Sequence, residues 1–116
     1  MKPLLIYITA RDKKQAKRIG RKLVEERLAA CANISGGIDS FYFWEGRLRR
    51  DHEAVLIVKT SHGLLNRLIK RVKSLHSYSV PCIVALPVIG GNPDFLAWVR
   101  KETAAGNPRS KRRSIT

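Results

Sequence analysis

Two aromatics, a carboxylate and an amine lie around one predicted turn and at the end of the strand that follows it. Tyr42, Trp44 and Glu45 belong to the run Phe-Tyr-Phe-Trp-Glu-Gly-Arg, and Lys59 closes the next apolar run. If the turn and the strand end meet a neighbouring subunit, these groups line a cleft suited to a small anion or metabolite. The alternative is that the same residues form an ion pair and an aromatic plug that hold the subunits together.

His76 is a second candidate, because an imidazole at a helix end either caps the helix or binds a metal ion. It follows the apolar stripe of a predicted helix and precedes an extended segment, a position where the helix dipole stabilises a protonated ring. Zinc and copper normally take three or four N, S or O ligands. His76 alone therefore predicts only weak binding of Cu(II) or another divalent cation, unless the loop brings Cys82 to it.

The sequence contains no pattern typical of an active site. We find no nucleophile beside a base, no glycine-rich phosphate loop, no HExxH and no CxxC. We predict a protein that is not an enzyme and that requires no cofactor.

The charge balance is unusual for a chain that makes a single domain. Its 116 residues include 23 Lys and Arg against 9 Asp and Glu, a net charge of +14. Such an excess favours anionic partners such as nucleic acid, anionic lipid or phosphate metabolites.

The cysteines and the apolar segments bear on location. Cys31 and Cys82 each lie in an apolar segment, which predicts two reduced, buried thiols in a cytosolic protein, with a disulfide or shared metal site as the alternatives.

The apolar run over residues 4–10 fits a first strand better than a signal peptide, because charged residues follow it and there is no small-residue cleavage site. No segment approaches the roughly 20 apolar residues that span a bilayer. We predict a cytoplasmic protein without a membrane partner.

The hydrophobic pattern predicts one domain over residues 1–104 and a basic, disordered tail over residues 105–116. Strands are expected over residues 4–10, 31–44, 47–60 and 79–89, the second interrupted by a bulge or bend at Ser35-Gly36-Gly37. Helices are expected over residues 13–30 after an Asp12 cap, from a Ser61 cap to about residue 75, and over residues 94–104. Pro81 and Pro87 predict that the fourth strand lies at an edge or is irregular.

This order of elements is that of an α+β fold, the ferredoxin-like split βαβ sandwich with a C-terminal helix. Two helices would cover one face of a four-stranded antiparallel sheet, and no predicted element remains for the apolar opposite face. The hairpin that turns at Glu45-Gly46 also has arms too long for one small domain to cover. Copies of the same chain in a closed assembly are the simplest cover.

Five segments, in order and spacing, resemble the CutA divalent-cation tolerance family. They are Glu26-Arg27-Leu28-Ala29-Ala30-Cys31-Ala32-Asn33-Ile34, Tyr42-x-Trp44-Glu45-Gly46-Arg47-Leu48, Ile57-Val58-Lys59-Thr60, His76-x-Tyr78-x-Val80-Pro81 and Leu86-Pro87-Val88, with Trp98 near the end. The resemblance implies a ferredoxin-like subunit in a tight homotrimer of PII-like architecture, linked to tolerance of copper and other heavy metals. It adds Tyr78 to the candidate ligand-binding residues.

The chain departs from the family motif at the positions linked to copper. Ser79 and Cys82 stand where the motif usually carries glutamates. Ile8 occupies the place of a copper-binding cysteine found in some members, and Leu75 that of a paired histidine. Of that set only His76 remains.

Two further functions are compatible with the sequence. A basic ferredoxin-like module would bind nucleic acid, but an RNA-recognition sheet needs aromatics on its open face, and the basic residues lie mainly on predicted helix surfaces, where they usually form a solvated face. The other is a purely structural trimer whose ligand site has been lost.

Overall fold

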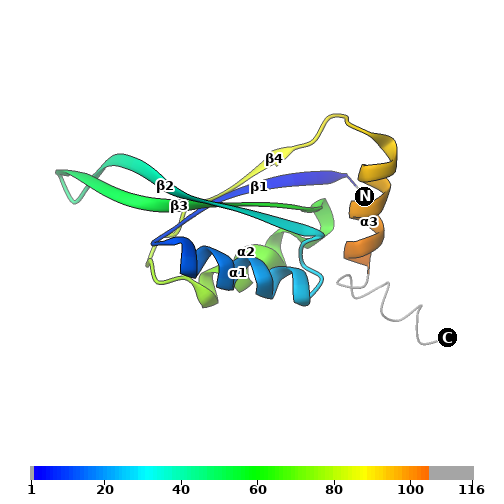
Figure 1. Ribbon diagram of the computed structural model, residues 1–116, viewed down its shortest axis with the longest axis horizontal. Coiled ribbons are helices and arrows are strands. Elements are labelled where there is room, and N and C mark those ends of the chain that lie inside the picture. Colours follow the sequence, from blue (N-terminus) through cyan, green and yellow to red (C-terminus); the bar gives the residue numbers. More distant parts are fainter. Residues whose placement is uncertain (1, 105–116) are drawn as a thin grey trace.

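A four-stranded antiparallel sheet in the order β2-β3-β1-β4 is the centre of the fold, as the computed structural model describes it for residues 2–104 (Figure 1). The central strands pair from Pro3 opposite Ser61 to Ala10 opposite Ala54. The strands are β1 (Pro3–Ala10), β2 (Cys31–Trp44), β3 (Arg47–Ser61) and β4 (Ile83–Pro87). This is the predicted ferredoxin-like arrangement, with the proline-bearing strand at an edge.

Two amphipathic helices cover one face of this sheet, and a third lies at its end (Figure 1). Asp12 caps the first helix as predicted, because its Oδ1 accepts a hydrogen bond of 2.8 Å from the Gln15 amide. The helices are α1 (Lys13–Glu25), α2 (Leu65–Leu75), preceded by the single turn η1 (His62–Leu64), and α3 (Pro93–Ala104). The core between sheet and helices is built by Leu4, Ile6, Ile8, Ala16, Ile19, Leu23, Leu56, Val58, Leu68 and Val72.

Gly20 lets α1 approach the sheet closely. A Cβ atom at this position would lie 2.9 Å from Leu56 Cδ1 and 3.1 Å from Ala32 Cβ, both closer than ordinary contact. The absent side chain therefore sets the distance between the helix layer and strands β2 and β3.

The opposite face of the sheet has no helix over it among the described residues, as predicted. Val84 and Leu86 of β4 are about half exposed, at 50% and 47%. They pair with Tyr7 and Leu5, whose neighbours Ile6 and Ile8 are buried under the helices, so the four side chains share the opposite face. We call this the open face.

The predicted bulge in β2 is present and decides which hairpin residues reach the open face. Ser35 lies opposite Val55 and Ile38 opposite Glu53, so three steps along β2 match two along β3. Gly37 has a φ of +78°, a conformation that glycine adopts readily. After the bulge, from Ile38 onward, the even-numbered residues of β2 share the open face with Glu53. Before the bulge, up to Ser35, it is the odd-numbered residues of β2 that lie on this face.

Two predicted boundaries were wrong, and one predicted cap lacks its side-chain hydrogen bond. α1 ends at Glu25 rather than residue 30, because Arg27 takes a φ of +61° and the Leu28 amide bonds back to the Leu23 carbonyl. Ser61 does not cap a helix with its side chain; its hydroxyl instead makes a buried 2.7 Å hydrogen bond to that of Thr103 in α3. The fourth strand pairs only over Ile83–Pro87. The predicted tail lies outside the described residues.

Within residues 2–104, no helix combines the length and apolar character that crossing a membrane would require.

Candidate functional site

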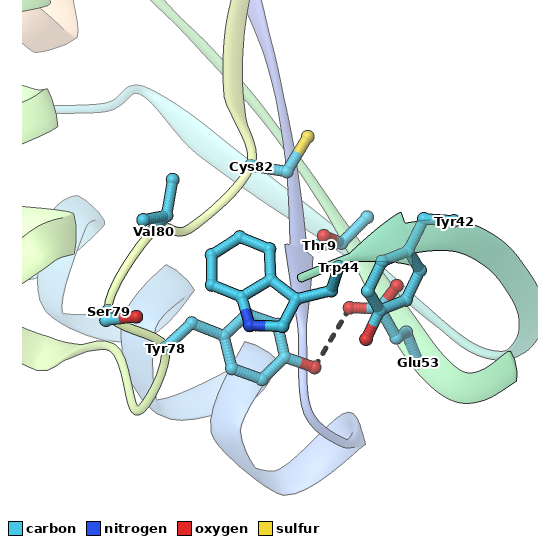
Figure 2. Close-up of a pocket in the computed structure, with 8 residues that line it drawn as sticks. All are labelled: Thr9, Tyr42, Trp44, Glu53, Tyr78, Ser79, Val80 and Cys82. Carbon is cyan, nitrogen blue, oxygen red and sulfur yellow. Dashed lines mark hydrogen bonds between the residues drawn. The ribbon is translucent and has the colours of Figure 1, made fainter. Parts of the chain in front are cut away.

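A groove of about 420 Å³ opens on the open face, where the β2–β3 hairpin leaves the rest of the sheet (Figure 2). The hairpin supplies Tyr42, Trp44 and Glu53, and the segment between α2 and β4 forms another wall. The residues that line it are Thr9, Tyr42, Trp44, Glu53, Tyr78, Ser79, Val80 and Cys82. The structure thus brings together three of the five predicted ligand-binding residues, Tyr42, Trp44 and Tyr78.

A hydrogen bond between Tyr78 and Glu53 joins two walls of this groove. The Tyr78 hydroxyl donates to Glu53 Oε2 at 2.9 Å (Figure 2), and Glu53 is only 9% exposed. Burial is the main cause of a strongly raised pKa of the Tyr78 phenol, and the hydrogen bond to Glu53 and its negative charge raise it further. Tyr78 is therefore a protonated donor at neutral pH.

Tyr42 makes a similar pair at the surface of the hairpin. Its hydroxyl donates a hydrogen bond to Asp51 Oδ2, and this bond is the main reason for the raised pKa of Tyr42. The two residues lie diagonally across the β2–β3 ladder, since Tyr42 is opposite Arg49.

His76 anchors the start of the groove wall that follows α2. Its Nε2 donates to the Thr9 carbonyl at 2.8 Å, and its Nδ1 accepts from the Tyr78 amide at 3.1 Å. The ring also contacts that of Tyr78, with centroids 4.6 Å apart. These bonds give both ring nitrogens a hydrogen-bond partner. His76 occupies the C-cap position of α2.

A metal site at His76 stays a prediction. Among residues 2–104, no group of three or more His, Cys, Asp and Glu side chains is arranged to hold a metal ion. A metal ion bound at either ring nitrogen would replace one of the two hydrogen bonds of His76.

Glu45 and Lys59 lie outside the groove. Glu45 is in the hairpin turn with a φ of +52°, while Lys59 pairs with Cys31 at the other end of β3 and its Nζ donates to Asn33 Oδ1. Twelve residue steps along β3 separate Arg47 from Lys59, or roughly 40 Å. Within one chain the two charges are therefore far apart, and contact between them across a subunit boundary stays a prediction.

Sequence reasoning missed Glu53, the one carboxylate of the groove lining. Its position in the sequence could have indicated its role. Glu53 comes just before the apolar run of β3, and alternation along a strand puts it on the same face as Val55 and Ile57. The lining contains three aromatic rings and no Lys or Arg. Within one protomer this combination suits a cation better than an anion.

Removal of the Tyr78 hydroxyl is expected to destabilise the fold and change its response to alkali. Tyr78→Phe leaves the buried Glu53 carboxylate without its donor, which costs about 1–3 kcal/mol of unfolding free energy. Because the folded-state pKa of Tyr78 is raised, its stabilising contribution is complete below about pH 10 and declines as the pH rises beyond that value.

Urea unfolding of wild type and Tyr78→Phe at pH 8 and pH 10.5 measures this contribution. We expect the difference between them to shrink at the higher pH. Tyr7→Phe, which alters another tyrosine of the open face, is the control. A difference that stayed constant or grew with pH would contradict the assignment.

Comparison with known proteins gives a consistent picture. The family described as CutA1 divalent ion tolerance protein matches residues 4–102. The chain is 46% identical over 99 residues to the "Divalent-cation tolerance protein CutA" of Thermus thermophilus, covering 85% of this chain and 96% of that protein. It is 43% identical over 100 residues to "Protein CutA 1, chloroplastic" of Oryza sativa, covering 86% of this chain and 56% of the rice protein. The chain thus spans little more than half the length of this plant relative.

Solved structures agree with the fold. The crystal structure of CutA1 from Oryza sativa superposes with a TM-score of 0.86 at 42% identity, covering 89% of this chain and 94% of that one. The Thermus thermophilus structure gives 0.85 at 46% identity, covering 87% and 98%.

Proposed function

Because this chain belongs to the family of CutA1 divalent ion tolerance proteins, we propose that it acts in the response to divalent metal ions, copper among them, as a non-enzymatic homotrimer. We further propose that small ligands bind in clefts between its subunits, where the groove around Trp44 and Tyr78 is completed by a neighbouring chain.

The exposed aromatic surface of the hairpin carries this proposal. Phe41, Phe43 and Leu48 are 66%, 74% and 64% exposed, and they lie on the hairpin face opposite the groove. The hairpin extends well beyond the helices that cover the rest of the sheet (Figure 1). Apolar surface of this kind, on two sides of one projecting element, is typical of a protein interface.

Polar groups on the same hairpin face are already arranged in a network. His52 Nδ1 lies 2.7 Å from Asp39 Oδ1, Arg50 lies 3.8 Å from the same oxygen, and the Arg50 guanidinium stands over the Phe41 ring at 5.9 Å. These contacts fix the side chains around the exposed rings, which lowers the entropy lost when a neighbouring chain covers them.

Light scattering at micromolar concentration tests the assembly. We expect a particle of about 39 kDa, three times the 13.1 kDa of the chain. A stable, monodisperse 13.1 kDa particle would contradict both the trimer and the intersubunit clefts.

The groove supports a cationic ligand more than an anionic one. The carboxylate of Glu53 and the rings of Tyr42, Trp44 and Tyr78 line it, whereas Lys59 lies at the far end of β3. We therefore propose a divalent cation, bound weakly, as the first ligand to test, and place a small anion second.

Calorimetric titration with Cu(II) tests the metal prediction. We expect weak binding that His76→Ala removes and His62→Ala, an exposed histidine at the start of η1, retains. Since His76→Ala also loses two hydrogen bonds, circular dichroism must show that the variant is folded. Unchanged stoichiometry in folded His76→Ala would exclude His76 as a ligand. Loss of binding in Glu53→Gln but not in His76→Ala would show that the groove carboxylate holds the ion without His76.

A further inference from the structure

The outer surface of the helix layer is strongly cationic. α1 contributes six Lys or Arg residues and α2 contributes four, while Glu25 is the one acidic residue within the two helices. Both helices lie on the same face of the sheet (Figure 1), and the Arg18 guanidinium donates to the Leu75 carbonyl of α2 at 3.1 Å. Their basic faces therefore form one continuous surface, which we call the basic layer. It contains Lys13, Lys14, Lys17, Arg18, Arg21, Lys22, Arg67, Lys70, Arg71 and Lys73.

Few of these charges are neutralised within the chain. Arg21 pairs with Glu25 at 3.3 Å, and Arg71 makes a bidentate pair with Glu26, in which the hydrogen bonds lower the pKa of the carboxyl. Among residues 2–104, six exposed lysines of the basic layer have no ion pair: Lys13, Lys14, Lys17, Lys22, Lys70 and Lys73. A surface whose charges only keep a protein soluble usually has acidic and basic residues interspersed. In the basic layer nearly all the charges are positive.

The residue types of the basic layer indicate which kind of anionic partner it suits. Its helices expose no aromatic or other large hydrophobic side chain. Single-stranded nucleic acid is held by stacking on aromatic rings, and interfacial helices enter a membrane through an exposed apolar face. Here the apolar faces of α1 and α2 are buried in the core. A charged surface without exposed rings suits recognition of a phosphate backbone by charge, without contacts to bases.

We propose that the basic layer binds the phosphate backbone of double-stranded nucleic acid without sequence preference. The 13 residues of α1 measure about 20 Å at 1.5 Å per residue, the length of roughly six base pairs. A shallow depression along this helix is bordered by Lys17, Arg18, Arg21 and Lys22, together with the Glu25 carboxylate that pairs with Arg21. The basic layer faces away from the open face, so it stays accessible when the open face is covered by other subunits.

Fluorescence anisotropy with a labelled 20-base-pair DNA duplex tests this proposal in the full-length chain. The test variant is Lys17→Glu/Lys70→Glu, which changes one unpaired lysine on each helix of the basic layer. The matched control is Arg100→Glu/Lys101→Glu, an equal charge change on exposed residues of α3, at the end of the sheet. We expect the test variant to lose at least about tenfold in affinity at 0.1 M salt and about two units of the log–log salt slope. The control should lose less than about threefold.

Three outcomes would overturn the proposal. The first is equal weakening in both variants, which would mean that net charge alone drives binding. The second is loss of binding in Lys111→Ala/Arg112→Ala/Arg113→Ala with none in the test variant, which would place the contact in the basic C-terminal sequence. The third is binding of phosphatidylserine vesicles, but not of duplex, that the test variant abolishes.

Discussion

Replacement of Trp44 with alanine is expected to shift the protein from the proposed trimer toward the protomer in light scattering. The indole is 42% exposed in the single chain and lies on the open face beside Tyr78 in the groove lining. Tryptophans that become buried at an interface commonly contribute 2 kcal/mol or more to association. An interface that loses this contact should therefore be weakened at least about 30-fold.

Trp98→Ala is the matched control for this change. Trp98 is 40% exposed, nearly the same as Trp44, but it belongs to α3 and contacts Phe95 with ring centroids 5.7 Å apart. We expect the control to keep its mass at concentrations where Trp44→Ala dissociates. If Trp44→Ala elutes and melts like wild type, Trp44 is not at the subunit interface.

Truncation of Leu56 to alanine is expected to cost about 2–5 kcal/mol of unfolding free energy, because it leaves a cavity in the centre of the core. Leu56 is 0% exposed and lies on β3, opposite Ile8. Urea denaturation measures the loss, and Ile89→Ala, at a fully exposed side chain, is the control that should change stability by less than about 0.5 kcal/mol.

A double-mutant cycle locates this effect between α1 and the sheet. Gly20→Ala alone adds a methyl group 2.9 Å from Leu56 Cδ1, an overpacked position that costs about 1–3 kcal/mol. In Gly20→Ala/Leu56→Ala the new methyl occupies part of the vacated space, so the combined loss should be smaller than the sum of the single losses. Strict additivity would show that the helix and the strand adjust independently.

The elements of the fold could be predicted because most of its signals are local. The long apolar strands, the i, i+3, i+4 stripes of both sheet-packing helices and the Asp12 cap each need only neighbouring residues to be recognised. The end of α1 could not be predicted, because the backbone at Arg27 has a positive φ, and arginine has no special preference for that conformation. Ser61 looked like a cap, but its partner is Thr103, 42 residues away.

The candidate site was only partly predictable, because it depends on strand register. An unbroken alternation from Cys31 would have placed Phe41 and Phe43 on the open face; the bulge before Ile38 placed Tyr42 and Trp44 there instead. Tyr78 was identified from its motif, but its partner Glu53 is 25 residues away in the sequence, on a strand that only the folded chain brings beside it. Glu45 and Lys59 were linked by their types, whereas the ladder holds them at opposite ends of the hairpin.

The double attachment of the segment after α2 bears on how quickly a ligand would be captured. His76 ties its first residue to β1, and Tyr78 ties its third to β3. A molecule that enters the groove therefore meets a preorganised wall and need not wait for a loop to order. Removal of either hydrogen bond should lower the association rate of the ligand more than it raises the dissociation rate.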